Sequence, residues 1–328
     1  MNESTNNPQN VNEDKRPIVP ANRRRVGYYP ETFISFSLPY RAPVVRTADG
    51  EKTAVPSLVW ERRNGNFILS MTAGAVTTVD KEGKEHREFV MPSGKYSRLV
   101  LHWLCSEAIA AGGPEIELST SWKGFLNNDL HLTWSPKTAR EVERQLRALL
   151  ALRLELTTIT PAEEGTNIRT ISCVVGKDVD LTFTQDGALD DRKSRIVLSQ
   201  EFWEQVVTLW PVPHNKKLWD QLVASTKSPL TLDVFLWLSH RLHRIEGADI
   251  GKSPVLSWDS LASQFGADGR VKKFREAFIK SSREIEAIDP QLIARVERVD
   301  APGRRNALTG IRLHLKKDVS KGYKNIAS

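Results

Sequence analysis

The sequence predicts an α+β fold in which one unit, made of a helix, a strand, two further helices and a β-hairpin, occurs twice. Apolar residues recur at the three- and four-residue spacing of helices between positions 93 and 152 and again between 216 and 288. Segments with the two-residue alternation of strands follow each helical stretch. The chain has 328 residues, more than one hydrophobic core usually holds, so two domains are expected.

Composition and pattern together divide the chain into four predicted parts. Hydrophobic residues make up 40% of the chain and charged residues 27%, which are ordinary values for a globular protein, so disorder is expected only at the ends. The parts are a disordered polar tail with a basic end (1–25), a small β-rich module (26–92), a first unit (93–205) and a second unit (206–328).

Short β-like runs define the predicted module. They are FISFSL at 33–38, the two runs of SLVWERRNGNFILSM at 57–71, and AVTTV at 75–79. Asn64 and Gly65 separate the two runs of the middle segment, and Asn-Gly between apolar runs is typical of a β-hairpin.

The first unit begins with a buried helix that starts after Gly94 and is ended by glycines at 112 and 113. A short strand, EIEL, and a second helix around Trp122–Asn127 follow. Ser135 and Pro136 offer an N-cap and a first-turn proline for a third helix that runs to about Leu152. Alternating segments at 154–160, 168–175, 179–183 and 195–199 then supply strands.

The second unit repeats this order without a residue-level repeat. After a lead-in helix at 216–224, Ser228 and Pro229 begin a longer helix, and the strand VLSW follows. Asp259 is expected to cap a short helix, SLASQFG, and Asp268 or Gly269 to open a long helix from about Arg270 to Ile288. Strands at 292–299 and 308–315 flank a basic turn. This is the element order of a winged helix, so we expect two tandem winged-helix domains after the module and the tail.

The basic excess of the chain lies in its C-terminal third. The whole chain carries a formal charge of +7. Residues 214–328 contain 21 Lys and Arg against 13 Asp and Glu, a balance of +8, whereas residues 1–213 contain 26 against 27. Charge concentrated in one domain is typical of a protein with a polyanionic partner. The sequence therefore favours nucleic acid as a ligand of the second unit.

The long helix of the second unit carries the main candidate site. Its apolar residues would bury one face, while cations crowd its first turn and a half. A helix-turn-helix places the start of its second helix in the DNA major groove, where Arg and Lys read base edges. The candidates are Arg270, Lys272, Lys273 and Arg275, with Ser263 and Gln264 from the preceding helix. The alternative is an amphipathic surface helix with solvated charges.

Two further groups of arginines are candidates for DNA contact. Arg304 and Arg305 lie in the predicted wing and would suit phosphates or an adjacent minor groove. Arg140, Arg144 and Arg147 lie on the third helix of the first unit. Glu141 and Glu143 alternate with these arginines and can pair with them at three- and four-residue spacing, so a solvated face or a partner surface is the alternative there.

The sequence predicts neither an enzyme nor a cofactor or metal site. Residues 247–253 approach a phosphate loop, but Glu246 stands where the motif needs its first glycine. Cys105 and Cys173 lack metal-ligand neighbours, and His240 and His243 suit the cationic end of a helix. With no signal-peptide pattern and no run of about 18 apolar residues, we expect a cytoplasmic protein without a membrane partner.

Several segments resemble the plasmid-encoded replication initiator (RepA) family. In the first unit they are MPSGKYSRLVLHWLCSEAI, SWKGFL and EVERQLRALLALRLEL; in the second they are WPVPHNKKLWDQLVASTKSPLTLDVFLWLSHRL, LSWDSLASQFG and VKKFREAF. The resemblance covers about Met91 to Leu315. It implies winged-helix domains that bind repeats in double-stranded origin DNA, open the origin, take part in plasmid copy control and recruit host replication proteins such as the helicase. It also implies a homodimer that represses its own promoter.

Two other classes of protein stay open. A winged-helix transcriptional regulator would bind an operator but would not maintain an origin-bearing plasmid. An adaptor whose basic face meets an acidic protein would show no sequence preference on DNA. A nicking enzyme is the least expected, because none of the five Tyr lies near clustered histidines.

Overall fold

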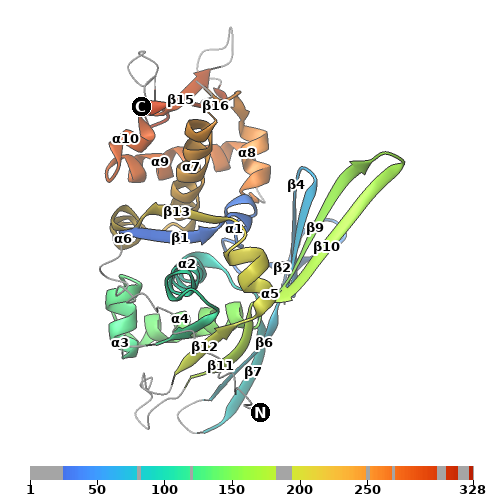
Figure 1. Ribbon diagram of the computed structural model, residues 1–328, viewed down its shortest axis with the longest axis vertical. Coiled ribbons are helices and arrows are strands. Elements are labelled where there is room, and N and C mark those ends of the chain that lie inside the picture. The colour runs from blue at the N-terminus through green and yellow to red at the C-terminus, as the bar shows by residue number, and fades with distance from the viewer. Residues whose placement is uncertain are drawn as a thin grey trace, which may run out of the picture.

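The computed structural model describes residues 25–79, 83–118, 121–181, 194–248, 252–267, 270–300, 308–316 and 325–327. These residues form a mixed α/β protein in which the two units lie one above the other along the long axis (Figure 1). No helix in these ranges is long and apolar enough to span a bilayer. The predicted tail falls almost wholly outside the described residues.

In the first unit, helices α2 (Gly94–Ala111) and α4 (Pro136–Leu150) pack against a three-stranded sheet. The other elements are β8 (Glu115–Glu117), α3 (Trp122–Gly124) with the π-helical turn η2 (Phe125–Asp129), β11 (Gly176–Asp180) and β12 (Arg195–Leu198). The strand order is β11-β12-β8. Helix α4 begins as predicted, because the Ser135 hydroxyl accepts a hydrogen bond from the Thr138 N–H and Pro136 occupies the first turn.

The second unit has the same strand order, and its elements follow in a similar order, except that the short helix α10 (Pro290–Ile293) takes the place of the strands β9 (Arg153–Ala162) and β10 (Gly165–Val174), which separate α4 from β11 in the first unit. Its elements are α7 (Pro229–Gly247), β14 (Leu256–Ser257), α8 (Trp258–Gln264), α9 (Val271–Glu286), α10, β15 (Val296–Asp300) and β16 (Leu308–Leu313). The sheet runs β14-β16-β15, so in both units the strand between the first two helices pairs with the last strand. The cap of α8 differs from the prediction: Ser257 accepts the hydrogen bond of the Ser260 N–H, and Asp259 lies in the first turn.

Strands of the N-terminal region pair with strands from later in the chain. The elements are β1 (Val26–Pro30), α1 (Glu31–Ser35), β2 (Val44–Arg46), β3 (Lys52–Pro56), β4 (Val59–Asn64), β5 (Phe67–Thr72), β6 (Gly74–Val79) and β7 (Glu85–Val90). Strands β4 and β5 form the predicted hairpin, with Gly65 at a φ of 58°. Strand β5 also pairs with β9 (Arg153–Ala162) in the sheet β10-β9-β5-β4, where β10 spans Gly165–Val174. In Figure 1 the β9–β10 hairpin extends away from the body.

The prediction of a strand at 33–38 is wrong. Phe33 and Ile34 lie in helix α1 and are both buried, as are Phe36 and Leu38. A strand with one solvated face would bury only alternate residues, whereas this short helix packs against α7 and can bury neighbouring ones. Tertiary burial therefore overrides the local alternation.

A central layer joins the two units. Strand β1 pairs antiparallel with β13 (Pro211–Asn215). Along the chain, α5 (Gln200–Phe202) and the π-helical turn η3 (Trp203–Val207) precede β13, and α6 (Lys216–Ser225) follows it. Arg98 on α2 forms a buried ion pair with Asp233 on α7, at 2.7 Å between Nε and Oδ1. The ammonium group of Lys95 donates to the Val223 and Thr226 carbonyls at the end of α6. A buried ion pair and two half-buried hydrogen bonds thus connect the two units.

Candidate nucleic-acid interface

An aromatic cluster fixes helices α8 and α9 on α7. The rings of Trp258 and Phe278 have centroids 5.6 Å apart, and those of Phe265 and Phe274 are 5.7 Å apart. Trp237 of α7 completes the cluster at 5.7 Å from Phe265. All five side chains are buried. Because such rings have few rotamers in a packed core, the cluster sets the angle between α8 and α9.

The face of α9 opposite this cluster carries the predicted cations. Arg270, Lys272 and Lys273 are exposed at the start of the helix, and Arg275 is half-buried. None of these four side chains forms a hydrogen bond or ion pair with another described residue. The helix begins at Val271, one residue later than predicted, with Arg270 at its N-cap. The positive end of the helix dipole and these cations therefore point to the same solvent-facing surface.

The remaining predicted residues of the second unit are only partly placed. Ser263 is exposed in α8, and Gln264 is half-buried at its last position. Arg304 and Arg305 lie in 301–307, outside the described residues, so the wing contact stays a prediction. The strands that bracket this segment pair with each other up to Asp300 and Leu308.

The arginines of α4 have different surroundings from one another. Arg144 forms a two-point ion pair with Glu88 of β7, at 2.8 and 3.0 Å, and its guanidinium holds the pKa of that carboxyl below its usual value. Arg147 pairs with Glu143 at 2.9 Å, as the four-residue spacing suggested. Arg140 is exposed, and its Nε lies 3.4 Å from the Pro136 carbonyl of its own helix. Contact of this helix with DNA stays a prediction, and Arg140 is its most accessible member.

Two residues that the sequence analysis did not select are part of this arrangement. Glu88 takes up the charge of Arg144, and it comes from a strand 56 residues earlier. Arg62 of β4 donates to the carbonyl of Gly266, in the turn between α8 and α9. Nothing in the local sequence of either residue indicates these partners, since both contacts depend on the packing of distant segments.

Cys105, Cys173 and His240 lie apart from one another, on three different elements of the described residues. No three His, Cys, Asp or Glu side chains among them gather as a metal site. Cys105 and Cys173 are free and buried, and burial raises the pKa of the Cys173 thiol to about 11. His240 lies on α7 beside Glu31, at 3.5 Å, and burial lowers its pKa to about 4. Residues 249–251 of the phosphate-loop near-miss lie outside the described ranges.

The described chain thus defines a mixed α/β protein with two similarly built units and a cationic helix end on the second. Comparison with protein families finds no match, and no curated protein matches the chain. A crystal structure of selenomethionine derivatives of domains 2 and 3 of RctB is similar with a TM-score of 0.48 and 8% identity, covering 86% of this chain and 96% of that one. A second structure of RctB domains 2 and 3 gives a TM-score of 0.45 and 9% identity over 87% and 96%. Similarity at this level assigns neither a family nor a function.

Proposed function

We propose that the chain is a sequence-specific DNA-binding protein whose two units are winged-helix domains. One observation carries the proposal: the long helix α9, which follows the short helix α8, presents cations at its N-terminal end that have no partner among the described residues, while its other face packs into an aromatic core. This is the arrangement with which a helix-turn-helix enters the major groove. The shared strand order of the two units supports the assignment of both as winged helices.

In this proposal the protein binds repeats at a plasmid origin and initiates replication, without catalysis or cofactor of its own. The segments that resemble plasmid initiators support this narrower role. Host replication proteins, including the helicase, are the proposed partners of the DNA-bound protein, and a homodimer is the proposed form at its own promoter. Arg270, Lys272, Lys273 and Arg275 lie at base edges or nearby phosphates, with Ser263 and Gln264 beside them, while Arg304 and Arg305 bind backbone.

The test uses the full chain and DNA duplexes that the wild-type protein enriches from a random pool by binding. Lys273→Ala is compared with Lys280→Ala, because both side chains are exposed on α9 and seven residues place them on one face, about 10 Å apart along the axis. Loss of a base contact should cost roughly 1–3 kcal/mol on the enriched site and much less on a random duplex. Lys280→Ala should change neither. Equal losses for both variants on both duplexes would contradict base reading by the start of α9.

The replication role has its own test. DNA that carries the gene and its flanking sequence is joined to a selectable marker without another origin. We expect a bacterial host to maintain this circular DNA when it encodes the wild-type protein. We expect the DNA to be lost when it encodes Lys273→Ala. Specific binding without maintenance would instead identify a transcriptional regulator, and wild-type protein without any sequence preference would identify the adaptor.

A further inference from the structure

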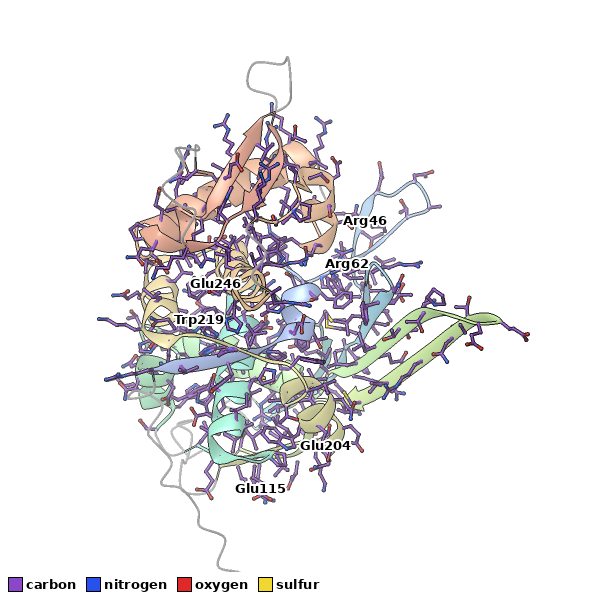
Figure 2. The ribbon with its side chains drawn as sticks, turned by 45° about the horizontal axis from the view of Figure 1, so that its top comes forward. Arg46, Arg62, Glu115, Glu204, Trp219 and Glu246 are labelled. Carbon is purple, nitrogen blue, oxygen red and sulfur yellow. The ribbon has the colours of Figure 1, made fainter. Side chains whose placement is uncertain are left out.

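Arg62 connects the N-terminal hairpin to the turn between α8 and α9. Its Nη2 donates to the Gly266 carbonyl at 3.1 Å, across 204 positions of sequence. Its guanidinium carbon lies 4.7 Å from the centroid of the Trp60 ring, and that side chain is buried. Figure 2 shows Arg62 where the hairpin approaches the second unit. The cation is thus held on an aromatic platform on one side and on the turn on the other.

The turn that receives this contact is tightly specified. Gly266 has a φ of 63°, the left-handed conformation that ends α8, and the Ala267 N–H donates to the Ala262 carbonyl at 2.9 Å. A Cβ on Gly266 would lie 2.7 Å from Nε of Arg62. The left-handed backbone therefore favours glycine here, and the Arg62 side chain would have to shift to admit a Cβ. Arg62 thus binds the carbonyl of Gly266, the residue whose left-handed backbone ends α8 before α9.

The strand that carries Arg62 is anchored on the first unit. Strand β4 pairs with β5, and β5 pairs with β9, which follows α4 directly. Leu69 and Met71 of β5 and Leu154 of β9 are buried in the common core. A contact from β4 to the α8–α9 turn therefore ties the predicted reading helix to the sheet β10-β9-β5-β4, whose strand β9 follows α4 of the first unit.

We propose that Arg62 is a positioning residue for DNA recognition. By holding the Gly266 turn against β4, it fixes the orientation in which α9 presents its cations, and with it the preference for one sequence over others. This inference rests on the proposed function of α9. The competing role is a direct contact of the Arg62 guanidinium with a phosphate, which would add affinity on every duplex alike.

The experiment compares Arg62→Ala with Arg63→Ala in the full chain. Arg63 is the matched control, because it is an exposed neighbour whose Nε donates to Gly65 of its own hairpin turn, at 3.1 Å. Affinity is measured on a site enriched by the wild type and on a random duplex of equal length, over a range of salt concentrations. Circular dichroism and thermal melting establish that each variant is folded, and Arg62→Lys, which keeps a charged donor, is measured in parallel.

With Arg62→Ala, the preference for the enriched site should fall about tenfold, the effect of losing roughly one hydrogen bond to a charged group. The salt slope should stay that of the wild type, because no phosphate contact is lost. Arg62→Lys should retain part of the preference and Arg63→Ala all of it. If Arg62→Ala does not fold, Arg62→Lys decides the test. A reduced preference of Arg62→Lys for the enriched site over the random duplex supports the proposal, and a preference equal to that of the wild type overturns it.

Two further results would overturn the inference. An unchanged preference in folded Arg62→Ala would show that the turn does not need this contact. Equal weakening on both duplexes, with a slope shallower by about 0.9, would identify Arg62 as a phosphate contact. Both results leave the proposed function intact. Wild-type protein that enriches no sequence would overturn the proposed function and this inference with it.

Discussion

The buried ion pair between Arg98 and Asp233 should dominate the coupling of the two units. Its two hydrogen bonds measure 2.7 and 2.8 Å, and the side chains are 0% and 5% exposed. Nη1 of Arg98 also donates to the Pro39 and Gly94 carbonyls, at 3.2 and 2.8 Å, and Nη2 donates to Leu38. Asp233→Ala would leave a desolvated guanidinium with carbonyl partners only. We expect a loss of about 3–5 kcal/mol in the free energy of unfolding.

An apolar double replacement separates this loss from packing. Arg98→Met with Asp233→Leu removes both charges, so the cost of an unpaired buried ion disappears. The carbonyls of Leu38, Pro39 and Gly94 lose their donor, so the double variant should lie between the wild type and Asp233→Ala.

Urea unfolding followed by tryptophan fluorescence measures these changes. Arg195→Ala is the control, because Arg195 pairs with Asp178 at 2.9 Å but both side chains are about half exposed, and such pairs contribute roughly 0–1 kcal/mol. A loss below about 1 kcal/mol for Asp233→Ala, or a double variant less stable than Asp233→Ala, would refute the reasoning.

Two further predictions concern the histidines of the central layer and the arginines of α4. Burial lowers the pKa of His102 well below 6.5 and that of His214 to about 4, so the folded state favours both rings in their neutral form. The free energy of unfolding should therefore be highest above about pH 6.5 and decrease as the pH falls toward 4. His214→Gln should make the melting temperature depend less on pH in this window. If α4 contacts DNA, Arg140→Ala should lower the DNA affinity and reduce its dependence on salt concentration. Arg144→Ala should lower the affinity less, because Glu88 already neutralises that cation. Equal losses of affinity for the two variants, measured over a range of salt concentrations, would contradict this prediction.

Some of the candidate site could be predicted from the sequence, because its signals are local. The amphipathic pattern of 270–288 predicts which face of α9 is buried, and the structure confirms Phe274, Phe278 and Ile285 inside and Lys272 and Lys273 outside. The surroundings of the site could not be predicted in this way. Arg144 has Glu88 as its partner and Gly266 has Arg62, and these pairs join positions 56 and 204 residues apart.

The sequence by itself determined where α4, α7 and the turn of the β4–β5 hairpin begin. Ser135 and Ser228 cap their helices by accepting a hydrogen bond from an N–H three residues on, and Gly65 allows the hairpin its left-handed backbone. These interactions close within a few residues, so a short stretch of sequence fixes them.

Only the tertiary structure decided that 33–38 contains a helix, that β5 pairs with β9, and that the two units meet through Arg98 and Asp233. Strand pairing and burial depend on which surfaces remain uncovered once the whole chain has packed. A local pattern cannot specify this, because the same alternation of apolar residues suits several partners and even a different element.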